Sequence, residues 1–187
     1  MQKTWHKLGR GDATAYRIFS VRREQYLSPR TGQPLNATIL EAPDWVNVIA
    51  LTPDQDCVLI RQYRFGTDRF TLEIPGGMID PGETPLQAAE RELREETGYT
   101  AAHWTSLGRV APNPAFMRNH LYTFLAEGCV QSGAQVQDPG EDIEVLLKPL
   151  AAIDGMMESG EIDHALVMVA FLALDLKRRN PRGETAV

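Results

Sequence analysis

The chain has 187 residues, of which 43% are hydrophobic and 24% are charged, and its formal net charge is −6. This composition predicts a globular protein with one well-formed core, in one domain with an N-terminal extension. The acidic balance argues against binding to nucleic acids or membrane surfaces, but anionic substrates remain possible because a bound divalent cation can invert the local field.

The compartment expected from the sequence is the cytoplasm. The N-terminal stretch MQKTWHKLGRGDATAY has no apolar segment of the kind found in signal peptides. The longest apolar run, at 165–174, is too short to span a bilayer. Cys57 and Cys129 are the two cysteines of the chain. They suit a reducing compartment, although one disulfide between them is possible.

Short β-rich runs, separated by turn residues, recur along most of the chain. They lie at 16–27, 37–42, 46–51, 57–64, 104–110, 120–128 and 142–148. The segment at 52–56, with Pro and two Asp residues, predicts a hairpin connection between two of these strands.

Helical signals are interspersed among the strands. Residues 149–160 predict a short helix, and residues 164–179 predict a longer one with Asp163 as its N-cap. The basic residues 177–179 suit the negative end of that helix dipole. The pattern predicts an α+β protein, with an α/β/α sandwich as its arrangement.

A third helix is predicted at 84–97. Thr84, Pro85 and Gln87 form a capping box with proline at the first helical position. Gly98 supplies the stop. At helical spacing the predicted buried stripe consists of Leu86, Ala89 and Leu93.

The same helix carries an unusual density of negative charge. From Glu73 to Glu96 the chain has seven carboxylates and two arginines, and Glu92, Glu95 and Glu96 share one helical face. One interpretation is a solvated face. The other is a site for a hard divalent cation, which prefers oxygen ligands. The Gly- and Pro-rich segment at 75–83 favours the second, because glycines let backbone carbonyls approach a metal or phosphate closely. Arg91 and Glu83 are expected to hold this loop to the helix.

The spacing of these residues resembles the Nudix box. Gly77, five residues, Glu83, seven residues and then RELREETGY match the pattern Gly-x5-Glu-x7-Arg-Glu-U-x-Glu-Glu-x-Gly-U, where U is a bulky apolar residue. Tyr99 at the last position is a mild departure from an aliphatic residue.

The resemblance implies a Nudix fold, in which helices sandwich a mixed sheet, and metal-dependent hydrolysis of a nucleoside diphosphate linked to another group. It covers 46–180, so that residues 1–45 are expected to form an N-terminal strand extension involved in dimerisation, and residues 181–187 a tail.

Site roles are implied by the same resemblance. The metal, Mg²⁺ or Mn²⁺, is expected to bind Glu92, Glu95, Glu96 and the backbone carbonyl of Gly76. The catalytic set is expected to comprise Glu141 as the base, Glu95, Arg91 as the residue that orients the carboxylates, and Glu83. Asp142 and Glu144 are alternatives to Glu141.

Features outside the box resemble the branch of the family that hydrolyses ADP-ribose and other nucleoside diphosphate sugars. Arg61 and Arg64 in RQYRFG are candidate phosphate or base contacts, although a strand arginine can also be merely solvated. Pro114 lies fifteen residues after Tyr99, where ADP-ribose hydrolases often carry a proline. Trp45 could stack on a base, or lie half-buried in the core. His120 and His164 are expected to be structural.

The predicted reaction converts ADP-ribose into AMP and ribose 5-phosphate. The expected partners are a small nucleotide-sugar substrate and a second copy of the chain in a homodimer, with no nucleic acid and no membrane. Alternative substrates are GDP-mannose, a dinucleoside polyphosphate or capped RNA. A further alternative is a regulatory module that binds nucleotide sugars without hydrolysing them.

Overall fold

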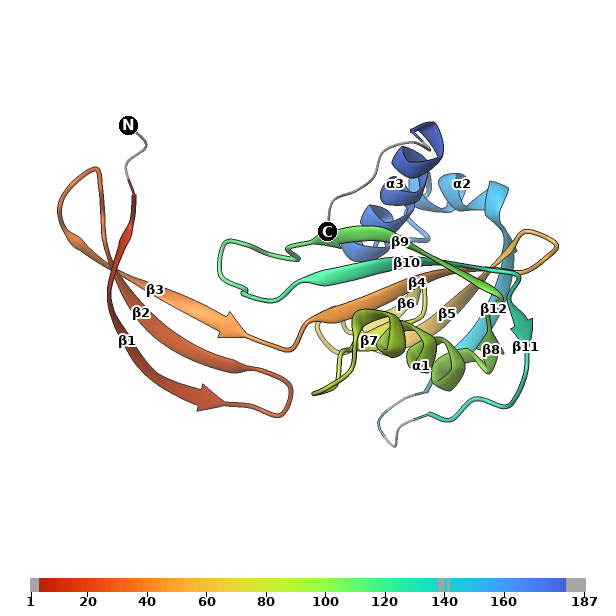
Figure 1. Cartoon of the computed structure of the whole chain (residues 1–187), viewed down its shortest axis with the longest axis horizontal. Helices are drawn as coiled ribbons and strands as arrows, with labels where there is room; N and C mark the ends of the chain where they lie inside the picture. The colour runs from red at the N-terminus through yellow and green to blue at the C-terminus, as the bar shows by residue number, and fades with distance from the viewer. Residues whose placement is uncertain (1–3, 138–139, 141, 181–187) are drawn as a thin grey trace. The chain divides into compact units, whose positions relative to one another are not determined.

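The chain forms two compact units in a computed structural model that describes residues 4–137, 140 and 142–180 (Figure 1). The N-terminal unit consists of Met1–Asp44 together with Ala111–His120. The second unit consists of Trp45–Val110 and Leu121–Val187.

The N-terminal unit contains a three-stranded antiparallel sheet in the order β1-β2-β3. The strands are His6–Ala15 (β1), Ser20–Leu27 (β2) and Pro34–Glu41 (β3). The strand predicted at 16–27 therefore starts at Ser20, because a turn closed by a hydrogen bond from Tyr16 N to Phe19 O precedes it.

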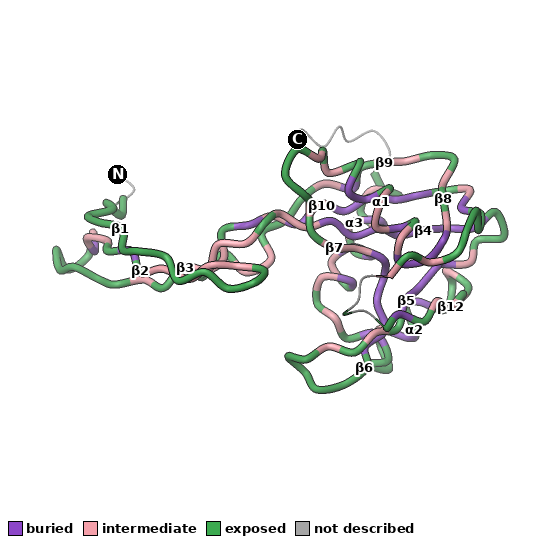
Figure 2. Tube along the Cα trace, turned by 90° about the horizontal axis from the view of Figure 1, so that it is seen from below, coloured by how far each residue is buried: buried purple, intermediate pink, exposed green. Residues whose placement is uncertain are grey.

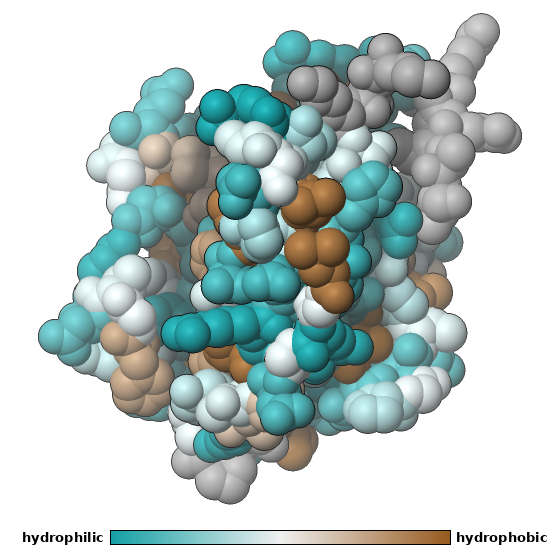
Figure 3. All heavy atoms as spheres, turned by 90° about the vertical axis from the view of Figure 1, so that its left-hand side faces the viewer, coloured by the Kyte–Doolittle hydropathy of each residue, from teal (hydrophilic) through white to brown (hydrophobic). Residues whose placement is uncertain are grey.

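Much of the surface of this sheet is exposed. Every residue of β1 is exposed, as the green tube in Figure 2 shows. On the face drawn in Figure 3, apolar side chains lie between hydrophilic ones. Several large apolar side chains of the chain are exposed to solvent. In the N-terminal sheet and its flanking turns they are Trp5, Leu8, Tyr16, Ile18 and Leu35.

A buried carboxylate ties the two chain segments of this unit together. The Glu24 side chain is fully buried and accepts hydrogen bonds from Arg118 Nη2 at 2.8 Å and from the Tyr26 hydroxyl at 2.6 Å. Lys7 Nζ lies 2.8 Å away. The hydrogen bond from Arg118, followed by those from Lys7 and Tyr26, holds the pKa of Glu24 far below its ordinary value. Residue 118 of the second segment is therefore bound to β2 by a charged contact.

The second unit is built on a mixed seven-stranded sheet. Five strands follow the order β12-β5-β4-β10-β9, while β6 pairs with β5 and β7 pairs with β4. β4 and β10 are parallel and the remaining pairs are antiparallel. The strands are Trp45–Leu51 (β4), Asp56–Arg64 (β5), Arg69–Glu73 (β6), Gly76–Met78 (β7), His103–Val110 (β9), Leu121–Glu127 (β10) and Glu144–Pro149 (β12). A separate two-stranded ribbon joins Tyr99–Thr100 (β8) to Val130–Gln131 (β11).

Helices cover both faces of this sheet (Figure 1). One face packs against α1 (Pro85–Thr97). The other packs against α2 (Ile153–Glu158), which follows a 3₁₀ turn at Leu150–Ala152, and α3 (Ala165–Arg179). The predicted α+β class and sandwich arrangement are confirmed.

The apolar sequence of β4 follows from this double cover. Val46, Val48 and Ala50 pack in the cluster beside α1, whereas Ile49 and Leu51 pack in the cluster beside α3. Successive side chains of a strand point to opposite faces, so a strand buried on both faces is apolar throughout.

Two local predictions about the helices are wrong. In the buried stripe of α1, Ala89 and Leu93 are buried as predicted, but Leu86 is exposed and Ala88 is buried in its stead, because the helix approaches the sheet through small side chains. Asp163 does not cap α3, since its carboxylate pairs with Arg69. The cap is His164, whose Nδ1 accepts a hydrogen bond from Leu166 N at 3.2 Å.

Sulfur-containing side chains also take part in the core. Cys57 is fully buried in the core, and Met156 packs in the same cluster with Met157 against its edge. Cys57 and Cys129 are both buried thiols. Among the described residues, no helix combines the length and the apolar character needed to cross a bilayer.

Candidate active site

Local sequence signals set both ends of α1. Thr84 Oγ1 accepts a hydrogen bond from Gln87 N at 3.3 Å, and Gln87 Oε1 accepts one from Thr84 N at 2.9 Å, which is the predicted capping box. Gly98 ends the helix with a φ of 74°, a left-handed conformation that favours glycine. The start and end of the helix are therefore fixed by short-range contacts, and with them the direction in which its carboxylates point.

The segment before α1 begins with a strand where a loop was predicted. Gly76–Met78 pairs antiparallel with β4, so that Gly76 lies opposite Asn47. A Cβ on Gly76 would lie 2.8 Å from Asn47 Cα and would also overlap Val46 O. A Cβ on Gly77 would lie 2.6 Å from Glu92 Cδ. A side chain at position 76 would therefore collide with neighbouring backbone, whereas one at position 77 would displace the Glu92 carboxylate.

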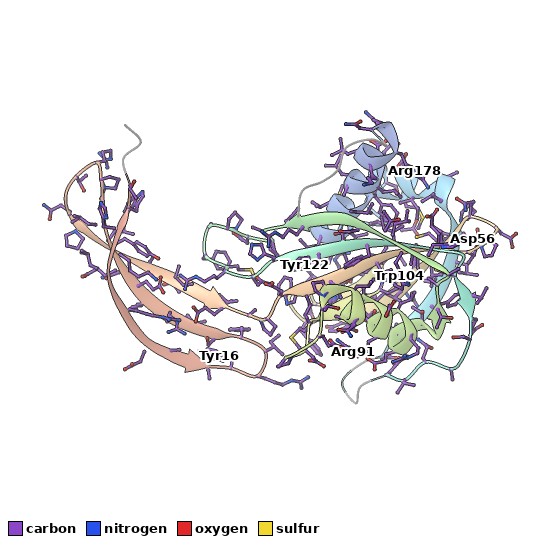
Figure 4. The ribbon with its side chains drawn as sticks, viewed as in Figure 1. Tyr16, Asp56, Arg91, Trp104, Tyr122 and Arg178 are labelled. Atoms are coloured by element: carbon purple, nitrogen blue, oxygen red, sulfur yellow. The ribbon has the colours of Figure 1, made fainter. Side chains whose placement is uncertain are left out.

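Arg91 connects this segment to the helix. Figure 4 labels Arg91 on α1, and its guanidinium donates to Met78 O at 2.9 Å and to both oxygens of Glu83, at 2.8 and 3.0 Å. These contacts confirm the predicted tie between Arg91 and Glu83. Hydrogen bonding from Arg91 lowers the pKa of Glu83, and the same bond is the main cause of the raised pKa of Arg91.

The three carboxylates predicted to bind metal have different partners. Glu96 is 3% exposed, and its Oε2 accepts a hydrogen bond from Gly76 N at 2.8 Å. Arg91 Nη1 donates to Glu92 Oε1 at 2.8 Å and to Glu95 Oε2 at 3.1 Å. Arg91 thus holds two of these carboxylates, and the backbone of β7 holds the third.

The donor set suits a hard divalent cation. Three carboxylates on one helical face, beside a glycine strand, offer several oxygen ligands within a short stretch of chain. The missing Cβ at Gly77 leaves room for the Glu92 carboxylate to lie against the glycine backbone. Within the described ranges, no three His, Cys, Asp or Glu side chains already form a metal-binding group.

The two strand arginines are both paired with carboxylates. Arg61 Nε donates to Glu144 Oε2 at 2.7 Å. Arg64 donates through Nε and Nη2 to the two oxygens of Glu73, at 2.7 and 2.6 Å. Glu73 is buried, and burial alone would raise its pKa, but the hydrogen bonds and charge of Arg64 lower it. Glu73 is therefore a carboxylate that fixes the Arg64 side chain.

The predicted base and its alternatives follow residue 137. Glu141 lies outside the described residues. Asp142 is exposed, and Glu144 is the first residue of β12. Glu144 pairs with Arg61, so the structure brings one alternative next to a predicted substrate contact.

The remaining predicted residues belong to different elements of the chain. Trp45 is half-buried at the start of β4, where it lies opposite Met78 of β7. Pro114 is exposed and belongs to the N-terminal unit. His120 lies beside Asp44 and His164 caps α3, as expected of structural residues.

Replacing Arg91 by lysine is expected to lower the free energy of unfolding by about 2 kcal/mol. One ammonium group cannot replace the guanidinium contacts to Glu83, Glu92 and Met78 O, and a hydrogen bond to a charged group contributes about 1.5–3 kcal/mol. Urea denaturation gives the measurement. Arg94→Lys is the control on the same helix, because Arg94 is exposed. Equal stability of the two variants would contradict the connecting role of Arg91.

Sequence reasoning missed several residues around α1. Gln135 and Gln137, from the segment that follows β11, donate side-chain hydrogen bonds to backbone carbonyls, among them Glu96 O. No motif or spacing marks them, because their partners are backbone atoms of remote segments.

The sequence and the fold are both similar to those of known proteins. The NUDIX domain model matches residues 43–170. ADP-ribose pyrophosphatase from Bacillus subtilis (strain 168) is 33% identical over 147 residues, which cover 78% of this chain and 80% of that protein. ADP compounds hydrolase NudE from Escherichia coli (strain K12) is 30% identical over 112 residues, 60% of each chain. A crystal structure of ADP compounds hydrolase has the same fold, with a TM-score of 0.83, 24% identity and 98% of both chains covered.

Proposed function

The chain belongs to the Nudix family of hydrolases, and on that premise we propose that it hydrolyses the pyrophosphate bond of a nucleoside diphosphate sugar. ADP-ribose is the proposed substrate. Water adds to one phosphorus and the bridging oxygen leaves with the other phosphate, giving AMP and ribose 5-phosphate. The printed names of the two relatives, an ADP-ribose pyrophosphatase and an ADP compounds hydrolase, support this choice.

The observation that carries the proposal is the packing of the glycine strand against the acidic face of α1. Gly76 N binds the Glu96 carboxylate at 2.8 Å, and Gly77 leaves room for the Glu92 carboxylate. A merely solvated acidic face needs neither contact.

We expect Glu92, Glu95 and Glu96, with the Gly76 carbonyl, to hold a divalent cation, Mg²⁺ or Mn²⁺. When bound, the cation supplies Lewis-acid stabilisation of the charge on the phosphate oxygens. Hydrogen bonds within the chain orient the proposed ligands: Arg91 holds Glu92 and Glu95 beside each other, and Gly76 N orients Glu96.

Other residues are proposed to bind and orient the substrate. Arg64, whose guanidinium is fixed by the buried Glu73, is proposed to bind a phosphate group, and Arg61 and Trp45 are proposed as further contacts. Pro114, in the segment between β9 and β10, is proposed as another substrate contact. Glu141 is proposed as the general base that takes a proton from the attacking water. Asp142 and Glu144 are the alternatives.

We further propose a homodimer in the cytoplasm. The exposed apolar side chains and fully exposed first strand of the N-terminal unit support a surface that a second copy covers. Residues 1–45 are the proposed dimerisation extension of a Nudix domain at 46–180, followed by a tail at 181–187. The two buried thiols suit a reducing compartment.

The test is a substrate comparison. The purified protein is incubated with Mg²⁺ and, separately, with ADP-ribose, GDP-mannose, UDP-glucose or diadenosine tetraphosphate. Products are separated by ion-exchange chromatography, and kcat/KM is determined for each compound. ADP-ribose is expected to give the highest value, with AMP and ribose 5-phosphate as products.

Two outcomes would change the assignment. Preferred turnover of another compound would replace ADP-ribose by that substrate while keeping the reaction. Absence of turnover with every compound, combined with tight ADP-ribose binding in calorimetry, would overturn catalysis and favour a binding module.

A further inference from the structure

The segment after β11 runs along the C-terminal end of α1 and satisfies its last carbonyls. Ser132 N and Gly133 N donate to Gly98 O at 2.9 and 3.1 Å, and Val136 N donates to Glu95 O at 2.8 Å. The final carbonyls of a helix lack partners within the helix, so contacts from another segment stabilise that end. We call residues 132–137 the strap.

One strap side chain reaches beyond the helix. Gln135 Nε2 donates to Glu96 O at 2.5 Å and to Ile143 O at 3.1 Å. A single amide group therefore joins the backbone of a proposed metal ligand to the backbone of a residue located just before β12.

A second glutamine of the strap strengthens the attachment at Ile143. Gln137 Nε2 donates to Ile143 O at 2.9 Å, and Gln137 Oε1 accepts from Ile143 N at 3.1 Å. Ile143 is buried, with 4% of its surface exposed. Its backbone position is thus defined by side-chain contacts on both its N–H and its carbonyl.

The chemistry of these contacts requires a side chain at position 135 that donates two hydrogen bonds. The amide nitrogen of Gln135 carries two hydrogens, and each has a backbone carbonyl as its acceptor. A carboxylate of the same shape has no hydrogen to donate and would repel both carbonyl oxygens.

We propose that Gln135 is a positioning residue that fixes the acidic residues beside Ile143 relative to the carboxylates of α1. Asp142 and Glu144 flank Ile143 in the chain. The link from Ile143 O through the Gln135 amide to Glu96 O therefore determines where the backbone of both acidic residues lies relative to α1. Reacting groups have to be held within about 0.5 Å of their productive geometry, which is why a direct tie between the two acidic elements matters. This role rests on the proposed hydrolysis of a nucleoside diphosphate sugar.

The experiment compares Gln135→Glu with Gln131→Glu. Both variants introduce the same charge and shape, but Gln131 is exposed in β11 and, within the described part of the chain, its side chain makes no hydrogen bond. Steady-state kinetics with ADP-ribose should show a kcat lower by roughly 10- to 100-fold in Gln135→Glu, with KM changed less than about threefold. Gln131→Glu should match the wild type. Gln135→Lys, whose ammonium can donate to both carbonyls, should recover most of the loss.

Amide hydrogen exchange provides a readout that does not depend on activity. In Gln135→Glu, the Val136 and Ile143 amides should exchange on the order of tenfold faster, while the amides of α3 keep their wild-type rates. Unchanged exchange at both sites would overturn the tie, whatever the kinetics show. Faster exchange with wild-type kcat would overturn the positioning role. Absence of turnover in the wild-type protein would count against the proposed function, and the exchange data would still decide whether the tie exists.

Discussion

Replacing Glu96 by glutamine is expected to lower kcat about 1000-fold, with the fold unchanged. Glu96 is buried, and its carboxylate accepts a hydrogen bond from Gly76 N. A glutamine oxygen can accept the same bond, so the local structure should remain. The negative charge is lost, however, and with it a ligand of the proposed cation. A loss of about 4 kcal/mol of transition-state stabilisation, within the several kcal/mol that a metal ion contributes, corresponds to three orders of magnitude in rate.

The control for this prediction is Glu90→Gln on the same helix. Glu90 is exposed and lies outside the acidic face, so its variant should retain wild-type kcat. Circular dichroism and thermal unfolding establish that both variants are folded. If Glu96→Gln kept more than a tenth of the wild-type kcat, Glu96 would not be a ligand that the reaction requires.

Replacing the two glycines of β7 by alanine, one at a time, is expected to affect different properties, stability in one variant and activity in the other. Gly76→Ala should destabilise the protein by about 3 kcal/mol, the upper range for overpacking in a well-packed interior. Its Cβ would meet Asn47 Cα at 2.8 Å and Val46 O, which are backbone atoms of the central strand β4. These atoms cannot move without breaking the pairing of β4 with its neighbours. Urea denaturation measures the loss.

Gly77→Ala should instead lower the activity. Its Cβ would lie 2.6 Å from Glu92 Cδ, at the far end of a flexible side chain that can turn away. Stability should therefore fall by less than about 1 kcal/mol. The displaced carboxylate should lower kcat on the order of 100-fold, the size of effect expected for a misplacement of about 1 Å.

Gly66→Ala is the matched control for both variants. A Cβ at Gly66 meets nothing within 4 Å, and the change should affect neither stability nor rate. The prediction fails if Gly76→Ala is as stable as this control, or if Gly77→Ala loses stability rather than activity.

Features that depend on a few neighbouring residues could be predicted from the sequence. The capping box of Thr84 and Gln87 and the stop at Gly98 involve short separations, and the structure has all of them. The contact between Arg91 and Glu83 also followed from sequence, because the helix carries Arg91 back over the segment that holds Glu83.

Features that depend on tertiary packing could not be predicted in this way. Helical periodicity assigned Leu86 to the buried stripe, but the close approach of α1 to the sheet selects Ala88. Asp163 is a good capping residue by type, yet Arg69 of β6 competes for it and His164 takes its place. Gln135 binds Glu96 O across 39 positions of sequence, a separation that no local pattern encodes.

The contact between Glu24 and Arg118 has a consequence for the order in which the protein matures. The two residues are 94 positions apart in the chain. At a synthesis rate of about 5–20 residues per second, the arginine emerges from the ribosome roughly 5 to 20 s after the carboxylate that it covers. During this interval Lys7 and Arg10 are the cations already available to Glu24. The first sheet of the chain therefore completes its charge pairing only when the segment between β9 and β10 has been translated, so a nascent chain paused before residue 118 should expose this sheet to proteases.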